Sequence, residues 1–404
     1  MAIRIGIITS HPIQYQAPWF RALAREVDVK VFFAHRQTAE EQGKAGFGVA
    51  FEWDVDLLSG YEHQYLKNVS PKPGTGRFAG CDTPEISEII AANSKDGRKS
   101  FDAFIVNGWQ LKCYRQAAKA CRAAGIPVVV RGDSHLGTPR PQLKRLAMEF
   151  THRWLLRQFD GFLTVGQRNR EYLEHFGAKK GQIFFVPHFV DNDWFAAKAA
   201  EADSKRSELR KIWGADEETF VALFVGKFQA VKRPLDLLRA ISHLKAQRQQ
   251  ETKPRLLAVF VGAGILVNEL RAEAAKFAVD VHFAGFKNQG ELPTCYASAD
   301  VLVLPSVSET WGLVVNEAMA CGLPAIVSDG VGCGPDLIED GRTGFVFPIG
   351  DVAALAARIA ELAELRAAGH DFSPALVEKL RSYSIATAVD GTLRGISENF
   401  KVII

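Results

Sequence analysis

The chain has 404 residues, of which 47% are hydrophobic and 24% charged, and its formal net charge is +3. This length exceeds one ordinary core and favours two domains, while the composition excludes collagen-like, low-complexity and intrinsically disordered proteins. Six cysteines show neither a CxxC pair nor zinc-ligand spacing, which indicates reduced thiols in a cytosolic protein.

The amino terminus is predicted to be a first strand and not a targeting segment. Its apolar run over 3–9 ends at the polar residues Ser10 and His11. The longest apolar stretch elsewhere, 256–267, contains glycines and is too short to span a bilayer. We therefore expect a cytoplasmic protein without integral membrane segments.

Short apolar runs alternate with amphipathic segments along the whole chain. Near-continuous apolar strands joined by helices predict parallel sheets that are covered on both faces. In the first half, the expected strand and helix pairs are 3–9 with 17–26, 101–108 with 111–125, and 126–132 with 141–159. In the second half, the expected strands are 220–227, 255–264, 279–286, 299–306 and 324–329.

A polar, charged segment over 196–219 separates the two series and is the expected linker. We therefore predict an α/β protein with two Rossmann-like, doubly wound parallel-sheet domains, 1–198 and 199–383, that face a cleft. Ligands of such sheets lie beyond the carboxyl ends of the strands.

The charge is distributed unevenly between the halves of the chain. Residues 1–200 hold 27 basic and 20 acidic side chains, whereas the remainder holds 22 and 26. A basic first half suits an anionic partner, such as a phospholipid surface or a phosphorylated acceptor, and it equally suits a solvated face.

One strand-to-helix turn carries two glutamates that are eight residues apart. Glu309 and Gly312 lie in the loop, and a helix over about 313–320 places Glu317 one turn further on. The helix N-terminus suits a phosphate, and a carboxylate beside it would accept hydrogen bonds from sugar hydroxyls. In the alternative, Glu309 caps the helix and Glu317 is solvated. The spacing alone does not decide between them.

A second loop supplies cations. The strand ending at Gly226 is followed by Lys227, Lys232 and Arg233 before a helical pattern begins near Pro234. Two lysines five residues apart at a strand end can reach one pyrophosphate as point charges. The alternative is that they are ordinary surface lysines.

Together these blocks resemble the retaining, nucleotide-sugar-dependent transferases of glycosyltransferase family 4, which have the two-domain GT-B fold. The first half is similar only at 159–173 and 184–195. In the second half, the similar blocks are 225–240, 259–277, 281–286, 292–306 with the glutamates at 309 and 317, and 330–351.

The resemblance implies roles for the donor-side residues. Glu309 would contact the donor sugar near its anomeric carbon, Glu317 would hold the ribose hydroxyls, and Lys227 and Lys232 would bind the diphosphate. Lys227 stands where the family more often has arginine. The donor site would be completed by Gly226, Gly262, Gly312, Leu313, Val314, Phe286 and Lys287.

The resemblance also implies a first-domain histidine near the donor. His135, after Arg131 and Asp133, is the candidate to hydrogen-bond a sugar hydroxyl or the acceptor, and the alternative is an exposed loop histidine beside a turn-forming aspartate.

The first loop departs from the family, and there His11, Gln14 and Tyr15 are candidates for acceptor or phosphate contacts, against simple loop packing. A helix over 384–400 is expected to cross back onto the first domain, as in the family.

No metal and no other cofactor are expected. Asp54 with Asp56 and Asp191 with Asp193 have the spacing of a metal-binding carboxylate pair, but such spacings arise often by chance and transferases of this type use protein cations. The segment 141–159 pairs basic with apolar residues and could dock on a membrane surface; packing of its apolar side on the sheet is the favoured interpretation.

We therefore expect a metal-independent, retaining glycosyltransferase that uses a nucleoside-diphosphate sugar and a hydroxyl acceptor, lipid-linked or small, in polysaccharide or glycoconjugate assembly. No nucleic-acid partner is expected, and the basic first half would allow association with the inner membrane face. A nucleotide-sugar 2-epimerase or hydrolase, or a non-catalytic nucleotide-sugar-binding module, are the alternatives. A dinucleotide oxidoreductase is disfavoured, because no G-x-G-x-x-G follows the first strand.

Overall fold

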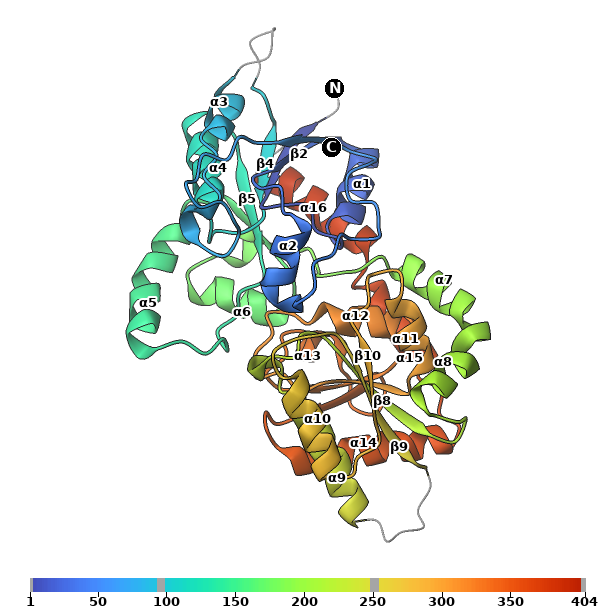
Figure 1. The fold of residues 1–404 in the computed structure, drawn as a ribbon. Coiled ribbons are helices and arrows are strands. Elements are labelled where there is room, and N and C mark those ends of the chain that lie inside the picture. Colours follow the sequence, from blue (N-terminus) through green and yellow to red (C-terminus); the bar gives the residue numbers. More distant parts are fainter. Residues whose placement is uncertain (1–2, 93–98, 248–253, 401–404) are drawn as a thin grey trace. The chain divides into compact units, whose positions relative to one another are not determined.

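The computed structural model describes residues 3–92, 99–247 and 254–400. Contacts divide the chain into two compact units, each built around one parallel sheet (Figure 1). Unit 1 comprises the described residues of 1–37, 56–188 and 383–404, and unit 2 comprises those of 38–55 and 189–382. The predicted pair of parallel-sheet α/β domains is confirmed.

Unit 1 contains a seven-stranded parallel sheet in the order β3-β2-β1-β4-β5-β6-β7. The winding reverses direction between β1 and β4. These two strands pair in parallel, with Ile5 opposite Ala103. The strands are β1 (Arg4–Thr9), β2 (Asp28–Phe33), β3 (Glu62–Tyr65), β4 (Ala103–Val106), β5 (Val128–Gly132), β6 (Gly161–Thr164) and β7 (Ile183–Phe185). The helices are α1 (Ala17–Glu26), α3 (Glu85–Ala91), α4 (Lys112–Ala123), α5 (Gln142–Leu156), α6 (Gln167–His175) and α16 (Ile385–Phe400), with short 3₁₀ turns η2 (Phe78–Gly80) and η3 (Lys180–Gln182).

The carboxyl-terminal helix α16 belongs to unit 1. It packs against α1, β6 and β7, all of which are distant from it in the sequence (Figure 1). A Cβ atom at Gly391 would collide with the carbonyl oxygen of Phe185, and one at Gly395 would press on Phe184. The two glycines therefore allow the helix to approach the sheet closely.

Unit 2 contains a six-stranded parallel sheet in the order β10-β9-β8-β11-β12-β13, with its reversal between β8 and β11. The strands are β8 (Phe220–Val225), β9 (Leu256–Val261), β10 (Val281–Gly285), β11 (Val301–Leu304), β12 (Ala325–Ser328) and β13 (Gly344–Phe347). The helices are α2 (Ala39–Gln42), α7 (Asn192–Ala202), α8 (Arg206–Trp213), α9 (Leu235–Gln247), α10 (Val267–Lys276), α11 (Leu292–Ser298), α12 (Leu313–Ala320), α13 (Gly334–Leu337), α14 (Val352–Ala367) and α15 (Ser373–Arg381). Three short elements accompany them, the π-helical η1 (Gly43–Phe47) and the 3₁₀ turns η4 (Asp203–Lys205) and η5 (Ala230–Lys232). All residues of β8, β9, β11 and β12 are buried, as expected for central parallel strands.

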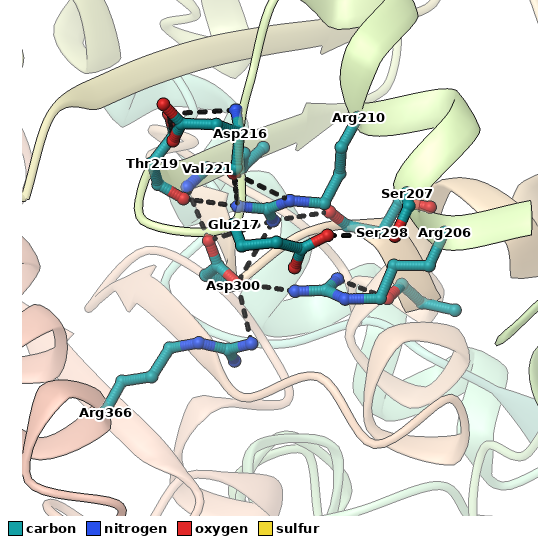
Figure 2. Close-up of polar contacts among 11 residues, drawn as sticks. Arg206, Ser207, Arg210, Asp216, Glu217, Thr219, Val221, Ser298, Asp300 and Arg366 are labelled. Carbon is teal, nitrogen blue, oxygen red and sulfur yellow. Dashed lines mark hydrogen bonds and ion pairs between the residues drawn. The ribbon is translucent and has the colours of Figure 1, made fainter.

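The segment 196–219 is not a linker. It forms most of α7, then η4 and α8, which pack against α11 inside unit 2. Figure 2 shows the reason: the guanidinium of Arg210, 1% exposed, lies 3.3 Å from the carboxylate of buried Asp300, which Arg206 and Arg366 also approach. Two of the charges that indicated a solvated linker, Arg206 and Arg210, instead pair with buried Asp300 and hold α8 to the start of β11. Arg366 joins α14 to the same carboxylate.

The division between the units lies at His188 and Phe189 instead of the expected 198 and 199. The segment 38–55, which was expected in the first domain, packs within unit 2. The ring centroids of Phe51 and Phe286 are 4.6 Å apart, and the side-chain amide of Asn288 donates a hydrogen bond of 2.7 Å to the Glu52 carbonyl. This segment therefore contributes to the surface of the second sheet.

Helix α5 also differs from the favoured interpretation of its sequence. Only Met148, Leu155 and Leu156 are buried, whereas its large apolar side chains at 143, 146, 150 and 154 are exposed. Within the described residues, no helix is both long and apolar enough to cross a membrane.

Candidate active site

Four of the donor-side residues predicted from the sequence, Lys227, Lys232, Glu309 and Gly312, lie in the loops where the winding of the unit 2 sheet reverses. The loops after β8 and β11 lie side by side there, since the N–H of Val307 donates a hydrogen bond of 2.8 Å to the carbonyl of Val231. Parallel sheets bind ligands at such reversal points, because the loops on either side diverge and leave a crevice.

Lys232 and Glu309 form an ion pair between these two loops. Their side chains are 23% and 14% exposed, and the hydroxyl of Ser306 donates a second hydrogen bond, of 3.0 Å, to the same carboxylate oxygen of Glu309. The Glu309 backbone is fixed as well, because it exchanges 3.2 Å hydrogen bonds with Gly330 and Gly332. A cation and a carboxylate are thus held in place at the strand ends.

Lys227 adds a second cation close to the pair. Burial lowers the pKa of its ammonium, the positive charge of Lys232 lowers it further, and Glu309 opposes both effects. The backbone beside it is tightly packed: Gly226 and Gly262 both have positive φ, and a Cβ atom at Gly262 would collide with the Gly226 carbonyl oxygen. Glycine is therefore required at 262 for the loops after β8 and β9 to meet.

Helix α12 begins at Gly312, which adopts a left-handed conformation with φ of 105° and carries no side-chain cap. The alternative in which Glu309 caps this helix is therefore wrong. The backbone amides of Leu313 and Val314 lie in the first turn, where amides have no partner within the helix and attract anions.

Glu317 is buried inside unit 2 and is not solvated, so that alternative is also wrong. Its side chain is accompanied by Tyr296, whose hydroxyl donates a 2.7 Å hydrogen bond to the carboxylate, and by Gln289. Burial raises the pKa of Glu317 to about 7, while the hydrogen bonds from Tyr296 and Gln289 lower it. The two glutamates are held by different partners, and Tyr296, Gln289 and Ser306 were not found from the sequence.

A hollow of about 680 Å³ in unit 2 includes Gly262 and Phe286. Its remaining wall comes partly from β10 and α10, including Arg271, and partly from residues 43–49 of the segment 38–55. No sequence pattern predicted the position of this segment, because 236 residues separate Asp54 from Gly290, whose N–H donates to the Asp54 carboxylate. Lys287 pairs instead with Glu291 at 2.8 Å, which raises the pKa of Lys287.

Unit 1 has its own cavity, of about 140 Å³, at the carboxyl ends of β1, β4 and β5. Tyr15, Arg131 and Asp133 line it together with His188, which the sequence did not single out. The Arg131 guanidinium donates a 3.0 Å hydrogen bond to the Pro187 carbonyl and lies 3.4 Å from Nδ1 of His188. Burial, together with the charge of Arg131, lowers the pKa of His188 to about 4, so this ring is neutral at physiological pH.

The other first-domain candidates lie outside the lining of this cavity. His11 is half-buried and its Nδ1 lies 2.9 Å from the hydroxyl of Ser10, and Gln14 is half-buried on the same loop. His135 is 1% exposed, so the alternative of an exposed loop residue is wrong. The only signal that could have indicated His188 is its position just after β7, behind Pro187.

Three of the four carboxylates of the two aspartate pairs have structural partners. The Asp54 carboxylate accepts a hydrogen bond from the N–H of Gly290, and the Asp56 carboxylate accepts hydrogen bonds from the N–H groups of Leu58 and Ser59. The Asp191 carboxylate accepts a hydrogen bond from the N–H of Trp194, in the first turn of α7. In the part of the chain that the structure describes, no group of three or more His, Cys, Asp or Glu side chains is arranged to hold a metal ion.

Two family models match the chain. The "Glycosyl transferase 4-like domain" matches residues 12–188, and "Glycosyl transferases group 1" matches residues 205–378.

Curated relatives are similar over part of their length. The chain is 33% identical over 201 residues to a D-inositol 3-phosphate glycosyltransferase of Streptomyces avermitilis, covering 48% of this chain and 42% of the relative. It is 32% identical over 280 residues to the enzyme of that name from Nocardiopsis dassonvillei, covering 65% of this chain and 62% of the relative. The matched region thus spans less than two thirds of either relative.

Solved structures share the fold over nearly the whole chain. HepE of Anabaena, in complex with UDP and glucose, aligns with a TM-score of 0.69 at 16% identity, covering 98% of this chain and 99% of that one. Sucrose-phosphate synthase of Thermosynechococcus elongatus aligns with a TM-score of 0.70 at 19% identity, covering 99% of each chain. These likenesses concern the fold, and both confirm the GT-B architecture expected from the sequence.

Proposed function

This chain belongs to glycosyltransferase family 4, and we propose that it is a retaining enzyme that moves a sugar from a nucleoside-diphosphate sugar to a hydroxyl acceptor. The observation that carries the proposal is the Lys232–Glu309 ion pair, set beside Lys227 and the N-terminus of α12 at the reversal point of the unit 2 sheet.

The diphosphate would bind between the two lysines and the first turn of α12. Lys227 and Lys232 supply positive charge, and the amides of Leu313 and Val314 supply N–H donors. As the bond between sugar and phosphate breaks, negative charge grows on the leaving diphosphate, and fixed positive groups stabilise it without reorganising. This charge on the protein takes the role for which other transferases use a metal ion, so we propose a metal-independent reaction.

Glu309 and Lys232 form a pair that donor binding would rearrange. When the Lys232 ammonium binds the diphosphate instead of Glu309, the Glu309 carboxylate keeps its hydrogen bond from the Ser306 hydroxyl. It can then accept a hydrogen bond from a sugar hydroxyl. Glu317, further along the same helix, would accept from the ribose hydroxyls, and the hollow bordered by Gly262 and Phe286 would receive the base. Complexes of HepE with UDP and with UDP and glucose agree with a nucleotide-sugar donor.

The acceptor would bind in unit 1, where Tyr15, Arg131, Asp133 and His188 line the small polar cavity. Neutral His188 and the Asp133 carboxylate can accept hydrogen bonds from hydroxyl groups, and Arg131 can bind an anionic substituent. This set suits a hydroxylated acceptor with a phosphate or another acidic group, of the kind used in glycoconjugate or polysaccharide assembly.

The test uses the purified chain, a panel of UDP-, GDP-, ADP- and dTDP-sugars, and EDTA throughout. Thermal unfolding identifies the donor, because a ligand that binds only the folded state raises the Tm. NMR of the product should then show the anomeric configuration of the donor retained in a new glycosidic bond. Release of a free epimerised or hydrolysed sugar at the same rate with and without acceptors would support the epimerase alternative instead. Donor binding without turnover would support a binding module.

A further inference from the structure

Helix α5 exposes an apolar stripe that its own domain leaves uncovered. Leu143, Leu146, Phe150 and Trp154 are 82%, 62%, 79% and 59% exposed, which is unusual for four large apolar side chains on one helix. At about 100° per residue, all four lie within roughly 80° of one another around the helix axis. The residues of α5 that are buried, Met148, Leu155 and Leu156, lie on the opposite side.

Basic side chains border this stripe on both sides. At about 100° per residue, Lys144 lies about 100° to one side of Leu143 and Arg153 about 80° to the other. Both are exposed, and residues 140–157 hold five basic side chains against the single acidic residue Glu149. Glu149 pairs with Arg153 at 3.4 Å and lies 2.8 Å from the ring nitrogen Nε2 of His175, and exposed pairs of this kind exchange readily.

An open hollow of about 950 Å³ adjoins the end of α5. Four basic side chains line it, namely Arg122, Arg153, Arg157 and Lys179. The one acidic side chain in the lining, Asp160, already accepts a 2.9 Å hydrogen bond from the N–H of Val128. Arg153, Leu156 and Arg157 at the end of α5 line this hollow, so the apolar stripe and the basic hollow adjoin each other on unit 1. Helix α5 lies at the outer edge of that unit in Figure 1.

We propose that this surface, the α5 stripe with its basic border and hollow, docks unit 1 on an anionic phospholipid bilayer. Phe150 and Trp154 would enter the boundary between head groups and acyl chains, while the long basic side chains remain at phosphate level. The hollow would receive lipid phosphates. A second copy of the chain fits the surface poorly, because a symmetric contact through α5 would bring its basic borders together. The inference concerns a different surface from the donor and acceptor sites and does not depend on the proposed reaction.

The experiment is co-sedimentation of the full chain with sonicated vesicles of phosphatidylcholine alone or with about one third phosphatidylglycerol. We expect binding to the anionic vesicles that weakens as salt is raised, since each basic side chain near such a surface strengthens binding by roughly fivefold at low salt. Phe150→Ser with Trp154→Ser should lower the partition coefficient at least about tenfold, because two large apolar groups lose their burial. Arg153→Glu with Arg157→Glu should lower it to a similar extent and remove the salt dependence.

The matched control is Ile212→Ser with Val377→Ser, which removes two exposed apolar side chains of unit 2, 63% and 57% exposed, and should leave vesicle binding unchanged. Thermal unfolding of every variant checks that the fold is intact. Equal binding by the wild type and the Phe150/Trp154 variant would overturn the proposal, as would no binding by the wild type. The proposal would also be overturned if the wild type formed a dimer in light scattering, did not bind vesicles, and lost the dimer in the Phe150/Trp154 variant. That result would assign the stripe to self-association.

Discussion

Unit 1 and unit 2 are wound in the same way, with a parallel sheet whose strand order reverses beside its first strand, yet they hold different polar groups at that point. In unit 2 the groups are a half-buried ion pair, Lys232 with Glu309, and a helix N-terminus. In unit 1 they are a buried arginine, Arg131, and a neutral histidine, His188, around a smaller cavity. The same winding thus places a ligand site at the reversal point of each sheet, and the side chains at the strand ends determine which ligand can bind there.

The comparison predicts that substitutions in the two units affect different kinetic constants. Changes in unit 2 should alter donor binding and the chemical step, and changes in unit 1 should alter use of the acceptor. The following expectations run from the largest effect to the smallest.

Lys232→Ala should produce the largest loss, because it removes a fixed cation from the leaving diphosphate. We expect kcat to fall by about 100- to 1,000-fold, as when one preorganised charge-stabilising group is removed elsewhere. Glu309→Ala should be similarly damaging, and the double variant should be little worse than either single one, since the two residues act as a pair. Lys245→Ala, which changes an exposed lysine on α9, is the control. Near wild-type kcat in Lys232→Ala would contradict the site assignment.

Glu317→Gln should change how stability depends on pH. The folded-state pKa of about 7 lies above the ordinary value of 4.5, so the buried neutral acid stabilises the fold fully below pH 4.5 and this contribution is lost as the pH rises through 7. The loss should reach up to about 3 kcal/mol in the wild type. Urea unfolding between pH 4.5 and 8.5 should show this decline in the wild type and not in Glu317→Gln. Equal slopes for both proteins would contradict it.

The same substitution should weaken donor binding, because an amide accepts hydrogen bonds from ribose hydroxyls less strongly than a carboxylate does. In the wild type, donor affinity should rise between pH 6 and pH 8 as the carboxylate ionises. In Glu317→Gln, calorimetric titration should show lower affinity and no such rise.

His188→Gln tests whether unit 1 binds the acceptor and unit 2 binds the donor. It removes a neutral ring, 3.4 Å from the Arg131 guanidinium, that would accept a hydrogen bond from the acceptor substrate. The acceptor KM should therefore rise about tenfold, which corresponds to the loss of one hydrogen bond. The donor KM should stay within about twofold of the wild type, because no residue of unit 2 is changed. His175→Gln, an exposed histidine of the same unit, is the control for soluble acceptors. An equal rise in both constants would show that the units do not divide the substrates as proposed.

Phe51→Ala should give the smallest effect and tests where the segment 38–55 acts. The aromatic contact with Phe286 should be worth about 1 kcal/mol, so donor affinity should fall about threefold to fivefold while the acceptor KM stays unchanged. Phe78→Ala, an exposed phenylalanine of unit 1, serves as the matched control. A change confined to the acceptor KM would place the function of this segment with unit 1.

The sequence predicted the two parallel sheets, because central strands such as β8 and β9 are apolar along their whole length and are separated by helical patterns. It also located Glu309, Gly312 and Glu317, because a strand-to-helix turn is local. The polar edge strand β3, with the sequence EHQY, carries no such signal.

The remaining features depend on contacts between residues that lie far apart in the sequence. Arg210 and Asp300 lie 90 residues apart in the sequence, and Asn288 lies 236 residues from Glu52. No local sequence pattern therefore predicts these contacts. The same holds for His188, which joins the unit 1 cavity through Arg131, and for α5, where Met148 is part of the hydrophobic core and Phe150 is exposed. Side-chain periodicity records that a segment has an apolar face, whereas the packing of distant elements determines whether that face is buried.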